Sequence, residues 1–241
     1  MTGGGPTTNF ALEALAERWT EAGLAGPSER ELLIPEGMEV GSADHLRFLT
    51  LPRAISGLYP EIGLWQRAGA AWADKATHWL FDTAQVAYAD WRAVEKALAP
   101  HGLAEHRQDV RGWYEVARGL QGRFKGDVAS LIAAGPKGQP ARTSAILAYL
   151  DASSTTFPFL SGDKTARLWL DQLRRIGGIE IIEDEPLRLA PSKEARDIAA
   201  THGLSLPSRA LPIQQLLALE AWAALDGDER EAILQGIQAQ G

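Results

Sequence analysis

The chain of 241 residues contains no cysteine. This absence excludes disulfides, thiolate metal sites, cysteine-bound iron–sulfur clusters and cysteine nucleophiles. Long apolar runs are absent too, and none approaches the roughly 18 residues that a membrane-spanning helix needs. The N-terminus shows no charged segment followed by an apolar stretch, so we expect no signal peptide, no membrane partner and a cytoplasmic location.

Basic residues are outnumbered by acidic ones, 24 to 31, and the formal net charge is -7. This balance argues against a protein that coats nucleic acid nonspecifically, because contacts to phosphates dominate such affinity, but it permits a local basic face. The five histidines show neither an HExxH pattern nor the tight spacing of a metal site. We therefore expect no metal and no cofactor.

Apolar residues at helical spacing fill most of the chain, and the expected fold class is all-α, with about ten helices joined by short loops. The pattern predicts helices over residues 10–22, 64–81 and 83–98, among others. Residues 32–34 alone invite a short strand. Trp65, Trp72, Trp79 and Trp169 are expected in the core.

A short turn that contains a glycine, an aspartate and a lysine begins at residue 157 and leads into an apolar helix. Gly162 permits a positive φ or a close backbone approach, and Asp163 is suited to cap the helix. The N–H groups of such a helix start bind anions or phosphates readily. Lys164 would lie in the first helical turn, where the helix dipole and partial burial would lower its pKa and make it nucleophilic. The alternative is an ordinary capped helix with a solvated lysine.

A carboxylate, Glu183, follows Lys164 by 19 residues. A short helix and a return loop would bring the two side chains back beside each other. An amine and a carboxylate held in one cleft perform imine or glycosyl chemistry.

This region resembles the helix-hairpin-helix of the endonuclease III and 8-oxoguanine glycosylase superfamily, whose pattern is Leu-Pro-Gly-Val-Gly-x-Lys-Thr-Ala. Gly162 matches the second glycine, and residues 164–166 match Lys-Thr-Ala. Aligned by spacing, Glu183 falls on the catalytic aspartate of that family and Arg188 on the arginine of the box that follows.

The resemblance implies a two-lobed, all-α HhH-GPD fold with the hairpin near residues 143–175. A flexible tail over residues 1–9 would precede a helical lobe over 10–104. A second lobe over 105–241 would hold the hairpin and the C-terminal helices, and both lobes would form one compact unit. A flipped base would enter the cleft between the lobes.

The activity that the resemblance implies is base excision from double-stranded DNA, with or without lyase activity. Lys164 would form a Schiff base with the sugar, Glu183 would stabilise the developing oxocarbenium charge, and Asp184 would be its substitute. The residues expected to bind the DNA phosphates are Ser161, Gly162, Asp163, Thr165 and Arg167.

Three alternatives remain open. Glu183 replaces the family aspartate and Glu185 the family histidine, which favours a catalytically degenerate member that only binds nucleic acid or a partner protein. An acidic surface, including the run over residues 180–185, suits a hydrolase of a free modified nucleoside better than an enzyme for duplex DNA. The third alternative is a helical protein without a catalytic site, in which Lys164 is a surface residue.

Overall fold

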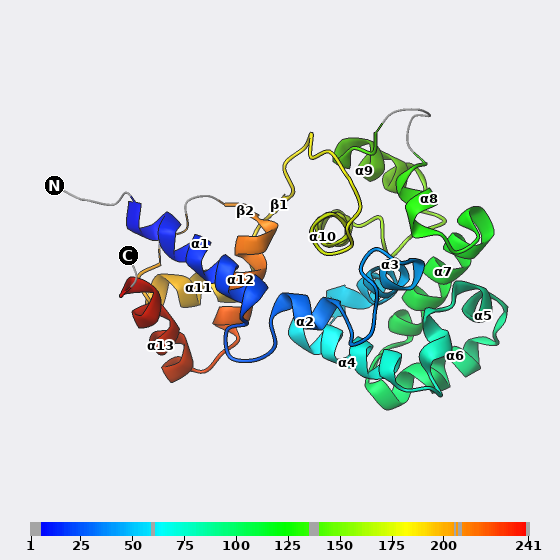
Figure 1. Ribbon diagram of the computed structural model, residues 1–241, viewed down its shortest axis with the longest axis horizontal. Coiled ribbons are helices and arrows are strands. Elements are labelled where there is room, and N and C mark those ends of the chain that lie inside the picture. The colour runs from blue at the N-terminus through cyan, green and yellow to red at the C-terminus, as the bar shows by residue number, and fades with distance from the viewer. Residues whose placement is uncertain (1–5, 59–60, 135–139, 205, 207–208, 240–241) are drawn as a thin grey trace. The chain divides into compact units, whose positions relative to one another are not determined.

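The computed structural model describes residues 6–58, 61–134, 140–204, 206 and 209–239 (Figure 1). Helices dominate this part of the chain, and its one sheet is a pair of two-residue strands, which confirms the predicted all-α class. No helix in the described ranges is long and apolar enough to cross a membrane.

The chain divides into two compact units. The first combines Met1–Glu31 with Leu187–Gly241, and the second is Leu32–Pro186. The lobe boundary expected between residues 104 and 105 falls inside the second unit. The first unit therefore contains both ends of the chain. A single boundary in the sequence cannot describe such a unit.

The first unit packs its N-terminal helix against its C-terminal helices (Figure 1). Its elements are α1 (Pro6–Glu21), β1 (Arg188–Leu189), α11 (Lys193–Thr201), β2 (Leu211–Pro212), α12 (Ile213–Ala223) and α13 (Gly227–Gln238). On α1, Leu12, Leu15 and Trp19 recur at helical spacing and are buried. On α12, Trp222 is fully buried. These apolar stripes form the core of the unit.

The second unit contains most of the helices. Its elements are α3 (Ala43–Thr50), η1 (Pro52–Leu58), α4 (Glu61–Ala73), η2 (His78–Phe81), α5 (Thr83–Tyr88), α6 (Trp91–Leu98), η3 (Ala99–His101), α7 (Arg107–Phe124), α8 (Val128–Ile132), α9 (Thr143–Ala152) and α10 (Asp163–Arg175). A further short helix, α2 (Glu29–Leu33), crosses from the first unit into the second.

An aromatic cluster forms part of the core of the second unit. The ring centroids of Phe48 and Phe81 are 5.5 Å apart, and those of Phe81 and Trp113 are 5.3 Å apart. Trp65 lies 5.7 Å from Phe48 and is buried, as predicted. Trp72 joins the cluster at 5.2 Å from Phe81 but is only half-buried.

Buried polar contacts attach α10 to the rest of the second unit. The Trp169 indole N–H donates to the Thr50 hydroxyl at 2.9 Å. The Gln172 side chain accepts from Arg53 Nε at 3.2 Å and donates to Glu61 Oε1 at 3.2 Å. Trp169, Gln172 and Arg53 are fully buried. These contacts join α10 to α3, η1 and α4, and so fix the helix that follows the predicted turn.

Two of the predicted helices are each divided. The helix expected over residues 64–81 ends at Ala73, because the Asp74 carboxylate accepts the N–H of Ala76 at 2.8 Å in a tight turn. The helix expected over residues 83–98 is interrupted before Asp90, whose carboxylate accepts the N–H of the second residue of α6. Such local side-chain bonds compete with continued helix.

The strand expected over residues 32–34 is wrong, because α2 includes two of these residues. Ser28 and Glu31 start this helix by reciprocal bonds, from Ser28 N–H to the Glu31 carboxylate at 2.7 Å and from Glu31 N–H to the Ser28 hydroxyl at 3.2 Å. The helix predicted from residue 10 begins earlier, at Pro6. Of the tail expected over residues 1–9, residues 1–5 lie outside the described residues.

Candidate functional site: the turn between α9 and α10

The helices α9 and α10 contact each other and are joined by a turn over residues 153–162. Phe157 and Leu160 are fully buried and anchor the turn. Backbone bonds from Phe157 N–H to Ser153 O and from Ser161 N–H to Phe157 O, both 3.0 Å, shape it. The pair of helices expected near residues 143–175 is therefore present, with an apolar base to its turn.

The N-terminus of α10 has no side-chain cap. Gly162 is the N-cap residue, with φ -62° and ψ 135°. The positive φ that glycine would permit is thus not used, and an added Cβ would meet only Thr165 Oγ1, at 3.9 Å. Asp163 does not cap the helix, since it is the first helical residue and binds Arg167 Nε at 2.7 Å. Among the described residues, nothing accepts the N–H groups of residues 162–165.

In the part of the chain that the structure describes, six other helices are closed at this end by a serine or aspartate side chain, whereas α12 has no side-chain cap. Such caps are Ser42 on α3, Asp82 on α5, Asp90 on α6, Asp127 on α8, Ser192 on α11 and Asp226 on α13. At α10 the unpaired N–H groups and the positive end of the helix dipole face outward at an exposed glycine. This arrangement suits an anion.

Lys164 is the second residue of α10, in the first turn as predicted. Its side chain is exposed and has no hydrogen bond or ion pair with any residue that the structure describes. The partial burial expected for a nucleophilic lysine is therefore missing. Its cationic end is available to a ligand from solvent.

Glu183, the expected partner of Lys164, is held by Arg174. The distance from Arg174 Nη1 to Glu183 Oε2 is 2.8 Å. Arg174 follows Lys164 by ten residues on the same helix, which corresponds to about 15 Å of axial rise. The structure thus brings Glu183 to the C-terminal part of α10, and the pairing of Glu183 with Lys164 stays a prediction.

Asp184 occupies the N-terminus of α9. Its Oδ1 accepts from Thr143 Oγ1 and from Ser144 N, both at 3.0 Å, and its Oδ2 accepts from Ser144 Oγ at 2.6 Å. The bonds from the Ser144 hydroxyl and N–H, with that of Thr143, lower the pKa of Asp184 to about 2. Asp184 is a long-range cap of α9, a role that its position in the sequence does not reveal.

Of the expected phosphate-binding residues, Arg167 has two carboxylate partners. It lies 2.7 Å from Asp163 Oδ1 and 2.6 Å from Glu185 Oε1. Partial burial works against its charge, but the hydrogen bonds to Glu185 and Asp163 outweigh this and raise the pKa of Arg167. Ser161 donates weakly to Pro158 O at 3.4 Å, and Ser161 and Thr165 are half-buried at the turn.

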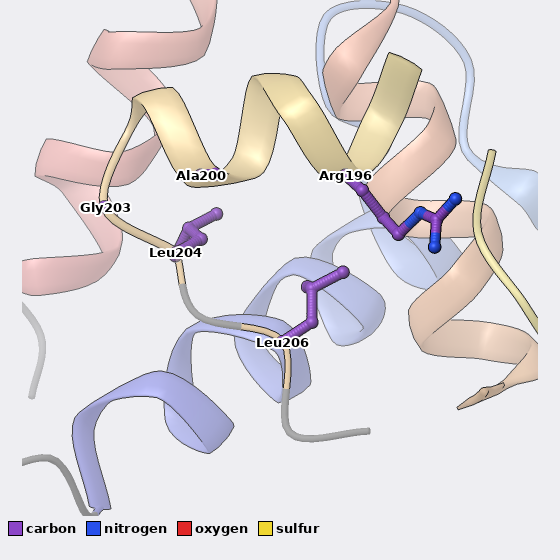
Figure 2. A pocket seen from close by; sticks show the side chains of 5 residues that line it. All are labelled: Arg196, Ala200, Gly203, Leu204 and Leu206. Carbon is purple, nitrogen blue, oxygen red and sulfur yellow. The ribbon is translucent and has the colours of Figure 1, made fainter. Parts of the chain in front are cut away.

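Two pockets are lined by residues outside this turn. One, in the first unit, has a volume of about 330 Å³ and is lined by Arg196, Ala200, Gly203, Leu204 and Leu206. Figure 2 shows the Arg196 side chain extending from α11 at one side of it. The other, in the second unit, has a volume of about 510 Å³ and is lined by Pro35, Glu36, Gly69, Trp72, Ala73 and His78. None of the predicted site residues lines either pocket.

The described ranges hold no group of three or more histidine, aspartate or glutamate side chains suited to a metal ion. Sequence reasoning did not foresee the pairing of Arg142 and Arg174 with the acidic run over residues 180–185. The sequence does contain a signal for part of this pairing: Arg167 and Arg174 are seven residues apart, which places both on one side of α10.

Comparisons of the chain with protein-family models, with curated proteins and with solved structures gave no match.

Proposed function

We propose that this protein binds nucleic acid, with duplex DNA as its principal ligand, and that the turn between α9 and α10 binds a backbone phosphate. The observation that carries the proposal is the open N-terminus of α10. Gly162 leaves the N–H groups of residues 162–165 without an acceptor among the described residues. A phosphate oxygen is the acceptor that such a helix end binds best. The resemblance of this turn to the helix-hairpin-helix supports the same ligand.

The side chains around the turn add a positive charge for the same phosphate. Lys164 is exposed and lies beside the open N–H groups. The one carboxylate in the first turn, Asp163, is paired with Arg167 and so opposes an incoming anion less than an isolated carboxylate would. Backbone donors together with one lysine bind a phosphate without reading the base.

Base excision by Lys164 and Glu183, with Asp184 as the substitute carboxylate, is a further prediction that the resemblance motivates. Both carboxylates have other partners, Arg174 and the N-terminus of α9. We therefore propose binding without excision, in line with a catalytically degenerate member of the family. Borohydride trapping on an oligonucleotide with an abasic site tests this: a covalent complex that Lys164→Gln abolishes would overturn the proposal of a pure binding protein.

The binding proposal is tested by closing the open helix end from within. In Gly162→Asp the new carboxylate would accept the free N–H groups of α10 and repel a phosphate. The backbone at Gly162 is compatible with a side chain, and an added Cβ meets nothing closer than 3.9 Å. We expect the variant to be as stable as the parent or more stable by a few tenths of a kcal/mol.

The matched control is Gly162→Ala, which adds the Cβ without a cap or a charge. Fluorescence anisotropy with a labelled 20-base-pair duplex should show binding by the parent and by Gly162→Ala. Gly162→Asp should bind at least about tenfold more weakly, because one phosphate contact is lost and a charge repulsion is gained. Equal affinity of Gly162→Asp and Gly162→Ala would refute binding through this turn.

A further inference from the structure

The acidic segment 183–185 lies against arginines of the α9–α10 hairpin, and each of its three carboxylates pairs with one of them. The pairs are Arg174 Nη1 with Glu183 Oε2 at 2.8 Å, Arg142 Nη1 with Asp184 Oδ2 at 3.7 Å, and Arg167 Nη2 with Glu185 Oε1 at 2.6 Å. Three successive acidic residues thus neutralise arginines from the start of α9 and from two turns of α10. An acidic run that faced a ligand would repel DNA, and here it faces the protein's own cations.

Asp184 is the residue that attaches the acidic segment to the start of α9. Its carboxylate is bound by Ser144 and by the fully buried Thr143. The carboxylate on each side of it is paired with an arginine of α10. The side chain of Glu183 is 33% exposed and that of Glu185 is 42% exposed, so solvent and solutes reach both ion pairs. The two outer carboxylates can therefore leave their arginines while Asp184 stays bound.

The arginines beneath these outer carboxylates lie on the same side of α10 as Lys164, and each has a second carboxylate partner on the helix: Asp163 for Arg167 at 2.7 Å and Asp171 for Arg174 at 3.7 Å. Lys164, Arg167 and Arg174 lie within about 80° of one another around the helix, at 100° per residue. They extend along about 15 Å of its axis, which matches about four phosphates of one DNA strand at an axial rise of 3.4 Å. Two of the three positions are occupied by carboxylates, Glu183 and Glu185.

We infer that the acidic segment 183–185 is an intramolecular competitor of nucleic acid: Glu183 and Glu185 occupy Arg174 and Arg167 as phosphate mimics, and a bound phosphate backbone displaces them. The inference rests on the proposed function, since it assigns the regulation of the same surface. Each carboxylate offers an arginine the same two-oxygen acceptor that a phosphate offers. The exchange conserves charge at the arginine and releases the glutamate to solvent.

The test is the double variant Glu183→Gln, Glu185→Gln, measured by anisotropy with the 20-base-pair duplex from 0.05 to 0.3 M salt. The variant removes one of the two carboxylate partners of each arginine, since Arg167 keeps Asp163 and Arg174 keeps Asp171, and this allows up to two new phosphate contacts. The slope of log affinity against log salt should become steeper by up to about 1.8, at about 0.9 per contact. At 0.1 M salt this corresponds to an affinity up to about 60-fold higher. Thermal unfolding midpoints close to that of the parent would show that the variant folds.

A general loss of negative charge is controlled by Glu180→Gln. Glu180 belongs to the same acidic run, is exposed, and has no hydrogen bond or ion pair with a described residue. This variant should leave the salt slope unchanged. Adding Arg167→Gln and Arg174→Gln to the double variant should return the slope to the parental value, because the contacts depend on these two arginines.

The outcomes separate the two proposals. If the parent binds and Gly162→Asp does not, but the double variant keeps the parental slope and affinity, the competitor is wrong and the proposed function stands. If the double variant gains slope and Gly162→Asp binds like the parent, binding uses the arginines and the proposed turn is wrong. If neither the parent nor the double variant binds duplex DNA, both proposals are refuted.

Discussion

Neutralising Glu61 by Glu61→Gln should destabilise the protein strongly, because this side chain balances a fully buried arginine. Glu61 Oε2 accepts from Arg53 Nη1 at 3.0 Å, and its Oε1 accepts from Arg53 Nη2 at 2.5 Å. Oε1 also accepts the Trp65 indole N–H at 2.7 Å. Arg53 has an exposed fraction of 0%, and the guanidinium also lies 5.0 Å from the Trp65 ring.

The magnitude follows from the environment of the pair. A glutamine keeps the shape and one acceptor oxygen but removes the negative charge of Glu61 from its ion pair with the buried Arg53. Breaking a buried pair by removing one partner costs about 3–5 kcal/mol. A pair at 4 Å in an effective dielectric of 20 interacts with about 4 kcal/mol, which agrees. We expect the free energy of unfolding to fall by about 3–5 kcal/mol, a large part of the 5–15 typical of a domain.

The matched control is Glu105→Gln, which breaks the exposed pair of Arg67 and Glu105. That pair has an Nη1 to Oε1 distance of 2.5 Å, with side chains 39% and 52% exposed. Exposed pairs contribute up to about 1 kcal/mol, so this variant should lose no more than that. Urea unfolding followed by tryptophan fluorescence measures both variants. A loss under about 1 kcal/mol for Glu61→Gln would refute the reasoning, since the buried arginine would then have no need of its carboxylate.

The pH dependence gives this prediction a second readout. Burial raises the pKa of Glu61, but the charge of Arg53 and the bonds from Arg53, Trp65 and Gln172 outweigh it and lower the pKa overall. The unfolded carboxylate, with a pKa of about 4.3, therefore binds protons more readily than the folded one. The stability that Glu61 contributes is complete above about pH 4.3 and is lost as the pH falls through the lower folded value. The difference between the parent and Glu61→Gln should shrink over that window.

Three further predictions concern other positions. Asp184→Asn should lower the thermal midpoint at pH 7, and its difference from the parent should vanish as the pH falls through about 2, the folded pKa of Asp184. Desolvation lowers the pKa of His45, whose Nε2 lies 3.0 Å from the Leu33 carbonyl oxygen. The free energy of unfolding of the parent, measured in urea, should therefore fall as the pH falls below about 6.5, the pKa of an unfolded histidine. This loss should be absent in His45→Gln. Gly126→Ala should destabilise by at least about 1–2 kcal/mol in urea, because φ is +80° and a Cβ would lie 2.2 Å from Thr83 Oγ1.

Local signals in the sequence were sufficient for most of the helices. Ser192 caps α11 by accepting the Ala195 N–H at 3.0 Å, and Gly203 follows the helix with φ +75°. Both roles depend on neighbours within a few residues, so the sequence alone predicts them. For α10 the apolar spacing predicts the helix, but its start differs by one residue, since Asp163 was expected as the cap and is the first helical residue.

Long-range pairings decided the rest of the candidate site. Ser144 and Asp184 are 40 residues apart in sequence, and Arg53 and Gln172 are 119 apart. Neither spacing has a periodic signature, because the contact depends on how helices pack and not on one helix or turn. Glu183 illustrates the consequence: its distance of 19 residues from Lys164 is compatible with contact, yet packing places it on Arg174.

One side of α10 packs against the protein core and contributes to stability, and the other carries the residues proposed to bind DNA. The predictions for stability and for binding are therefore independent of each other. At 100° per residue, Trp169 and Gln172 lie about 140–160° around the helix from Arg167. The Trp169 and Gln172 side chains are buried and bond to Thr50 and Glu61. Arg167 is bound by two carboxylates that solvent reaches, Asp163 and Glu185, and by the Pro186 carbonyl. Glu61→Gln should therefore lower stability while the folded protein keeps its salt slope for DNA. Glu183→Gln with Glu185→Gln should change that slope with little effect on unfolding, because exposed pairs add little to stability.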